Sequence, residues 1–171
     1  MFKEELARMR SRFDEVQEDP KLRDRLAEDL AKLIERLDLL QGLYEAHMDI
    51  GSGSALGLEL AWRTDTGITY LAILPEPDGS GRARLVPFDK SRMYGHQTFA
   101  TPKEALAEAL RRGYFETACG MMDRFAATPA WRKSIAEAQL ITRYSNSEIG
   151  SGEFHTAMRS LNDDSVGAAT A

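Results

Sequence analysis

The chain has 171 residues, of which 43% are hydrophobic and 29% are charged, and its formal net charge at pH 7 is −5. This length suits one domain, or one domain with a helical extension, and the mild acidic excess argues against a protein that coats nucleic acid non-specifically. The charge is uneven, because residues 1–50 carry 9 basic and 13 acidic side chains (net −4) whereas residues 79–103 carry five basic and one acidic (net +4).

The cysteine content and the apolar runs indicate where the protein is expected to act. The single cysteine, Cys119, excludes an internal disulfide and suits a reducing cytoplasm. The charged residues Lys3, Glu4 and Glu5 come directly after Met1 and Phe2, in place of an apolar signal segment, and no apolar run reaches the ~20 residues of a membrane span. We therefore expect a cytoplasmic protein that does not enter a membrane.

The first 50 residues are predicted to form two helices. Apolar side chains at alternating gaps of four and three residues favour a helix over residues 2–17. Asp19 then suits an N-cap and Pro20 suits the first position of a second helix, which we expect to run to about Met48. The second helix carries an apolar stripe (the leucine stripe) with the same spacing, made of Leu26, Leu30, Leu33, Leu37, Leu40 and Tyr44.

The leucine stripe predicts burial against another helix or a sheet, and two arrangements are compatible with it. In heptad terms Ala27 and Ile34 fall at e positions and Leu22 and Leu43 at g positions, so the apolar surface is wider than a two-stranded coiled-coil seam. In one arrangement the two helices form an antiparallel hairpin inside one subunit. In the other, the hairpin also dimerises into a four-helix bundle, which buries the leftover apolar edge. Replacement of Leu33 and Leu37 by charged residues is predicted to dissociate or unfold the protein.

Turn residues and β-forming segments follow the predicted hairpin. Gly51 to Ser54 are expected to end the second helix. Residues 56–62 alternate loosely and residues 68–74 are rich in β-branched and aromatic side chains, and the turn residues between them predict a β-hairpin. Residues 82–88 are a third predicted strand, which gives a three-stranded antiparallel meander, and residues 90–100 are expected to be a loop.

The remainder of the chain is predicted to be helical. Thr101, Pro102 and Glu104 combine an N-cap, a proline at the first helical position and a capping-box glutamate, and Gly113 is expected to end that helix. Further helices are expected over residues 114–126, from Thr128 to about Ile141 and over residues 154–161, followed by a disordered tail over residues 162–171.

The predicted fold class is α+β. We expect an N-terminal antiparallel helical hairpin in residues 1–50, which serves dimerisation or packing, followed by an α+β domain in residues 55–161. In that domain a three-stranded antiparallel sheet would be covered on one face by two or three C-terminal helices.

The basic middle of the chain is the first candidate for a binding site. It combines cations with aromatic side chains, and such a combination can hold phosphate groups and stack on bases. It can equally be a solvated sheet face followed by an ordinary loop, and no nucleic-acid-binding signature accompanies it. The residues concerned are Arg82, Arg84, Lys90, Arg92, Tyr94 and His96.

Groups that could support catalysis or cofactor binding are sparse. His47, His96 and His155 have no partner at metal-ligand spacing. The glycine-rich segment after residue 50 follows a helix and lacks the lysine of a phosphate loop. Cys119 is expected to be a buried small hydrophobe on a helix. The sequence therefore predicts no catalytic residue, no metal and no cofactor.

These observations favour a non-enzymatic, cytoplasmic protein-interaction module, such as an adaptor, assembly factor, inhibitor or chaperone. We expect it to bind a protein partner of unknown identity and to be a homodimer through its N-terminal helices. The alternative is a nucleic-acid-associated regulator that uses the basic strand and loop over residues 82–96. A third hypothesis is a small enzyme whose site lies near Arg92, Tyr94 and His96, with Cys119 as a further candidate.

Overall fold

The computed structural model describes residues 1–167, without the side chains of Asp24 and of residues 163–167. The chain forms two compact units. The first unit comprises residues 1–87 and 95–119, and the second comprises residues 88–94 together with the chain from Gly120 onward. N-terminal helices, an antiparallel sheet and C-terminal helices follow one another along the chain, so the predicted α+β class is confirmed.

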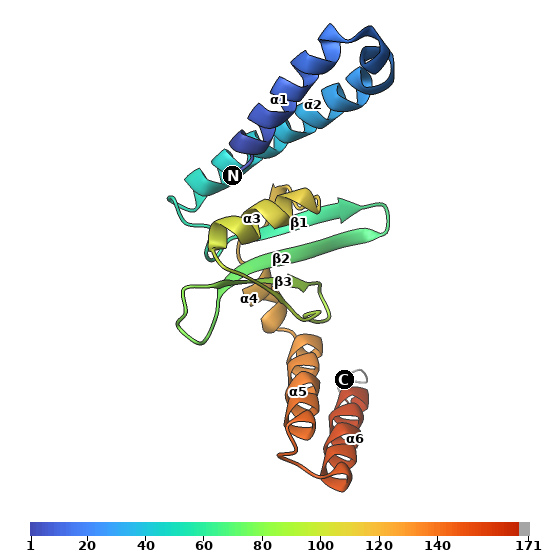
Figure 1. Ribbon diagram of the computed structural model, residues 1–171. Helices are drawn as coiled ribbons and strands as arrows, with labels where there is room; N and C mark the ends of the chain where they lie inside the picture. Colours follow the sequence, from blue (N-terminus) through green and yellow to red (C-terminus); the bar gives the residue numbers. More distant parts are fainter. Residues whose placement is uncertain (168–171) are drawn as a thin grey trace. The chain divides into compact units, whose positions relative to one another are not determined.

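The helical hairpin begins the first unit. It consists of α1 (Lys3–Glu18) and α2 (Pro20–Ile50) (Figure 1). Between them, the carboxylate of Asp19 accepts a hydrogen bond from the backbone N–H of Lys21 at 2.9 Å, so the second helix starts where its cap and proline predicted. The helix ends before Gly51, also as expected.

The start of α1 is fixed to the core by one aromatic residue. The side chain of Phe2 is fully buried, and its ring meets the ring of Tyr44 edge-on with 6.2 Å between centroids. The backbone N–H of Phe2 donates to Oε1 of Gln41 at 3.1 Å. These two contacts hold the start of α1 against α2 at the base of the hairpin.

The sheet has five strands rather than the expected three. They are β1 (Glu59–Thr64), β2 (Gly67–Pro75), β3 (Ala83–Phe88), β4 (Gln97–Phe99) and β5 (Glu116–Thr117). Their spatial order is β4-β3-β2-β1-β5. The hairpin of β1 and β2 pairs Glu59 with Ala72 and Thr64 with Gly67, which confirms its prediction.

The two additional strands correct two expectations. Residues 97–99 lie in the segment expected to be a loop, but they pair with β3, with Phe99 opposite Ala83. Residues 116–117 lie in the segment expected to be helical, but they pair with β1, with Thr117 opposite Leu60. Each of these strands lies at an edge of the sheet and forms backbone hydrogen bonds with the strand beside it. The spacing of apolar residues within a segment does not reveal such pairing. The helix expected over residues 114–126 is reduced to α4 (Met121–Ala126).

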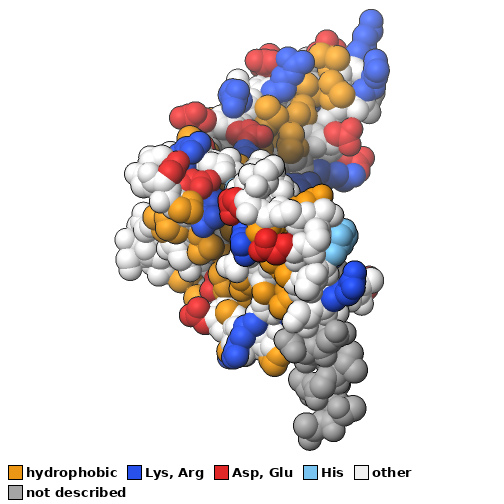
Figure 2. Space-filling model, turned by 90° about the horizontal axis from the view of Figure 1, so that it is seen from below, with side chains coloured by type: hydrophobic (Ala, Val, Ile, Leu, Met, Phe, Trp, Pro, Cys, Tyr) orange, Lys and Arg blue, Asp and Glu red, His pale blue; other side chains and the backbone are white. Residues whose placement is uncertain are grey.

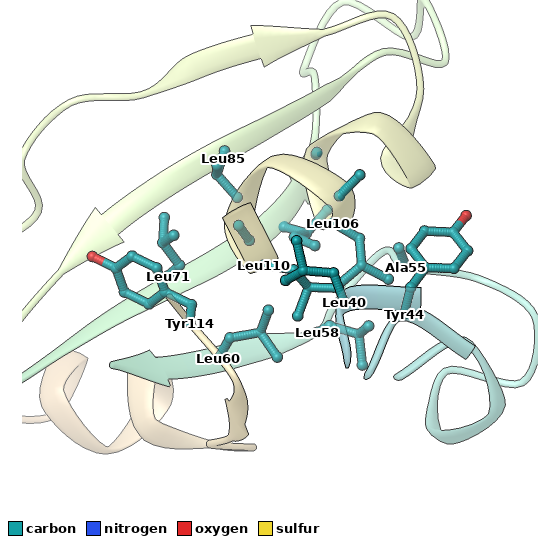
Figure 3. Close-up of a cluster of buried hydrophobic side chains, with 14 of the residues drawn as sticks. Leu40, Tyr44, Ala55, Leu58, Leu60, Leu71, Leu85, Leu106, Leu110 and Tyr114 are labelled. Atoms are coloured by element: carbon teal, nitrogen blue, oxygen red, sulfur yellow. The ribbon is translucent and has the colours of Figure 1, made fainter. Parts of the chain in front are cut away.

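One helix packs on the sheet within the first unit. This is α3 (Pro102–Arg111), whose N-cap Thr101 accepts a hydrogen bond from the backbone N–H of Glu104 at 3.2 Å, as predicted. Figure 3 shows side chains of α2, α3 and the sheet converging in one cluster. The cluster includes Leu40, Tyr44, Leu60, Leu71, Leu85, Leu106 and Leu110.

The second unit is helical and is centred on aromatic side chains. Besides α4 it contains α5 (Pro129–Ser145) and α6 (Ser151–Gly167). Trp131 is 2% exposed, its ring lies 5.8 Å from that of Phe88, and its indole N–H donates to the backbone carbonyl of Asp89 at 2.8 Å. Tyr144 and Phe154 stack where α5 and α6 meet, with ring centroids 4.7 Å apart.

The end of the chain differs from its prediction. The short helix expected over residues 154–161 extends from Ser151 to Gly167, so residues 162–167 are helical rather than part of a disordered tail. The rest of that expected tail, residues 168–171, lies outside the described residues.

Candidate interaction surfaces

The leucine stripe of α2 is divided into a buried part and an exposed part. Leu37, Leu40 and Tyr44 expose 3%, 3% and 9% of their surface and belong to the core of the first unit. Leu26 and Leu33 expose 37% and 39%. Because residues seven apart lie on nearly the same side of a helix, Leu33 continues the side on which Leu40 is buried. The stripe therefore runs from the core to the surface.

The exposed part of the stripe is broader than its two most exposed members. Leu30 is half-buried and Leu22, one turn before Leu26, is 38% exposed. Figure 2 shows hydrophobic side chains on the surface of the hairpin between basic and acidic ones. Isolated exposed leucines are common on protein surfaces, whereas a continuous apolar face on one helix is typical of a protein contact.

A groove lies on another side of the hairpin, between α1 and α2. It has a volume of about 550 Å³. Apolar side chains of both helices line it together with charged ones, and it is open to solvent. The lining residues are Arg10, Phe13, Asp14, Ala31, Ile34, Glu35 and Asp38.

Two ion pairs cross the seam between the helices on the groove side. Lys3 Nζ lies 2.8 Å from Glu45 Oε1, and Arg10 contacts both carboxylate oxygens of Asp38, at 2.8 and 2.9 Å. The hydrogen bond and the charge of Lys3, with a further hydrogen bond from Gln41, lower the pKa of Glu45. All four charged side chains are largely exposed, so the pairs fix the register of the hairpin more than they stabilise it.

Two of the three arginines of the basic middle, Arg82 and Arg84, lie beside a carboxylate. Arg82 donates to Asp78 at 2.8 Å, and hydrogen bonds from Ser80 and from Arg82 hold the pKa of Asp78 far below its usual range. Arg84 Nε lies 3.8 Å from a carboxylate oxygen of Glu76, in a half-buried position. Arg82 is thus hydrogen-bonded to its carboxylate, whereas the buried Nε of Arg84 has only this longer contact and no hydrogen-bond partner among the described residues.

The remaining residues of the predicted basic site lie in different units. Lys90, Arg92 and Tyr94 belong to the second unit, whereas His96 is an exposed residue of the first. The guanidinium of Arg92 lies over the ring of Tyr94, 4.9 Å from its centroid, and the Tyr94 hydroxyl donates to the carboxylate of Asp89. The structure brings Arg92 and Tyr94 together, with Asp89 beside them.

Of the groups considered for chemistry, His47 is part of the packed structure, whereas Cys119 is exposed. His47 is 3% exposed, and its Nε2 lies 3.0 Å from the carbonyl oxygen of Phe115. A carbonyl can only accept, so Nε2 carries a proton and ties α2 to Phe115, the residue before β5. Cys119 was expected to be buried on a helix, but it is exposed in the turn between β5 and α4, because that helix starts only at Met121.

Comparison of the chain with models of protein families, with curated proteins and with solved structures finds no match. Among the side chains that the structure describes, no group of three or more histidine, cysteine, aspartate or glutamate residues is placed to hold a metal ion. None of the helices in the described part of the chain is both long enough and apolar enough to cross a membrane.

Sequence reasoning found the leucine stripe but missed the groove. The signal for it was present, because Lys3 and Arg10 are seven residues apart on one helix and Asp38 and Glu45 are seven apart on the other. Opposite charges at matching heptad spacing indicate which faces of two antiparallel helices meet.

Proposed function

We propose that the protein is a non-enzymatic, cytoplasmic protein-interaction module that forms homodimers through the exposed part of the leucine stripe. The observation that carries this proposal is the exposure of Leu26 and Leu33, at 37% and 39%, on the side of α2 where Leu40 is buried. The single free Cys119 supports the cytoplasmic location. Within this class, the protein would serve as an adaptor, assembly factor, inhibitor or chaperone.

The exposed stripe suits a second copy of the same chain. If two α2 helices cross antiparallel about a two-fold axis near Leu30, Leu26 of one copy faces Leu33 of the other, and the reverse contact forms at the same time. Such an interface is self-complementary without any further element. Complete coverage of Leu22, Leu26 and Leu33 would contribute about 1 kcal/mol for each side chain, so the dimer is expected to depend on concentration.

Substitution of Leu33 by aspartate tests the dimer. We expect wild-type protein at tens of micromolar to have twice the mass of the 19.1 kDa chain, and Leu33→Asp to be monomeric with unchanged helix content. The matched control is Leu39→Asp. Leu39 is the more exposed of the two leucines, at 55%, and lies about 120° away around α2. Multi-angle light scattering and circular dichroism are the measurements.

Two results would contradict the dimer. One is a wild-type protein that stays monomeric over this concentration range. The other is a Leu39→Asp variant that dissociates as readily as Leu33→Asp, since the loss would then not be specific to the stripe.

The other two hypotheses receive less support from the geometry. For a nucleic-acid-associated role, Arg82 and Arg84 are already paired with carboxylates, which reduces the charge available to phosphate groups. For an enzyme near Arg92, Tyr94 and His96, the Tyr94 hydroxyl is already hydrogen-bonded to Asp89.

A further inference from the structure

The groove between α1 and α2 begins at Arg10–Asp38, the second of the two ion pairs that the described side chains form across the seam. The pairs Lys3–Glu45 and Arg10–Asp38 are seven residues apart on each helix. Seven residues after Arg10 on α1 is Gln17, and seven residues before Asp38 on α2 is Ala31. These two residues cannot form an ion pair. Because alanine has a short side chain, Ala31 leaves space at this position, and Ala31 is one of the residues that line the groove.

The groove combines an apolar surface with negative charge. Phe13 and Ile34 are half-buried residues of its lining, and Ala31 is an exposed one. Arg10 is paired with Asp38, whereas Asp14 and Glu35 have no ion pair among the side chains that the structure describes. The two carboxylates come from the two different helices, so the groove has an acidic residue on either side.

We propose that this groove binds a basic, amphipathic segment of a partner protein. A lysine or arginine of the segment would lie between Asp14 and Glu35 and form the third charge contact in the series, and an adjacent aliphatic side chain would pack on Phe13 and Ile34. The negative charge of the groove favours a positively charged partner. The apolar lining also favours a partner with apolar side chains, which a small inorganic cation does not have.

This surface is separate from the proposed dimer interface. At 100° per residue, Ala31 and Glu35 lie about 160° from Leu33 around α2, and Asp38 lies about 140° from it. A dimer formed through the leucine stripe therefore leaves the groove accessible. The inference deepens the proposed interaction function, but it does not require the protein to be a dimer.

A defined peptide tests the groove on the full-length protein. The probe is a fluorescently labelled amphipathic helix composed of leucine and lysine, and the comparison peptide has glutamate in place of every lysine. Fluorescence anisotropy at low ionic strength should show binding of the lysine peptide alone. For the double variant Asp14→Asn, Glu35→Gln, we expect binding about fivefold to tenfold weaker, and added salt should reduce this difference.

Two further variants make the test specific. Glu4→Gln, Asp29→Asn removes the same charge from exposed hairpin positions outside the groove and should bind as wild type does. Ala31→Leu fills the groove while keeping a strong helix former, so it should also weaken binding of the lysine peptide. The inference is overturned if the lysine peptide does not bind, if both peptides bind equally, or if the groove variants bind as tightly as their control.

The outcome can be separated from the test of the dimer. Leu33→Asp should still bind the lysine peptide even when it is monomeric. The double variant Asp14→Asn, Glu35→Gln should keep the mass of the wild-type protein.

Discussion

Asp89 organises the short segment that follows β3 in the second unit. Its carboxylate accepts hydrogen bonds from the backbone N–H groups of Ser91 and Arg92 and from the hydroxyls of Ser91 and Tyr94. Partial burial acts to raise the pKa of Asp89, but these hydrogen bonds outweigh it and lower the pKa to about 2. The backbone carbonyl of Asp89 also holds the indole of Trp131. One residue thus joins the segment to α5.

The lowered pKa of Asp89 predicts acid sensitivity. Because the folded pKa is about 2 and the ordinary value is 3.8, the unfolded chain binds the proton more tightly. The contribution of Asp89 to the free energy of unfolding is therefore fully present above about pH 4 and is lost as the pH falls towards about 2. We expect Asp89→Asn to lower the melting temperature at neutral pH and to lose less stability than wild type over that interval. Melts followed by circular dichroism measure both effects.

The control for this residue is Asp65→Asn, in the exposed turn between β1 and β2. It should leave the melting temperature at neutral pH close to that of wild type. If Asp89→Asn also loses stability in parallel with wild type, the hydrogen bonds of Asp89 do not stabilise the folded protein.

Leu33 and Leu37 show that two equally apolar residues of one stripe can differ in burial. Both belong to the leucine stripe, but Leu33 is 39% exposed and Leu37 is 3% exposed. Periodicity identifies the apolar side of a helix, whereas the extent of its burial depends on how far α3 and the sheet reach along α2. The sequence could therefore predict the leucine stripe, but not the residue at which its burial ends.

At the scale of elements, the predictions succeeded where local chemistry decides the structure. The caps at Asp19, Thr101 and Thr128, each followed by proline, begin α2, α3 and α5. They failed where a distant partner decides it, since β4 and β5 have three and two residues and exist only through pairing with β3 and β1. Gly113, with φ of +97°, ends α3 in the conformation that glycine favours.

Removal of the cap of α3 should destabilise the first unit. Thr101 is exposed and its hydroxyl accepts one hydrogen bond from the backbone of Glu104, so Thr101→Ala loses the cap without leaving a cavity. We expect a decrease of about 1 kcal/mol in the free energy of unfolding, measured by urea denaturation. Thr101→Ser keeps the acceptor and should stay close to wild type, and equal losses in both variants would exclude a capping effect.

The two units of the chain differ in how much apolar surface they bury. In the first unit α3 buries Ala105, Leu106, Ala107, Ala109 and Leu110, and β2 buries three consecutive residues, Leu71 to Ile73. In the second unit α5 buries Trp131 alone, and Ile141 on the same helix is 51% exposed. Local stability follows the density of such buried contacts.

This difference predicts unequal protection of the backbone. Amide hydrogens of α5 should exchange with deuterium faster than those of β2 and α3, because α5 can open without exposing a large core. Hydrogen–deuterium exchange followed by mass spectrometry measures the rates by segment. Equal protection of α5 and α3 would show that α5 has more support than its buried side chains indicate.

The seven-residue step between the ion pairs of the hairpin has a consequence for its length. Seven residues make almost two complete helical turns, or about 10.5 Å of rise. An insertion of seven residues into each helix beyond Arg10 and before Asp38 would move the tip outward and leave Phe2 and Tyr44 in place at the base. Evolution or a designer can therefore change the length of the hairpin while the contacts at its base stay the same.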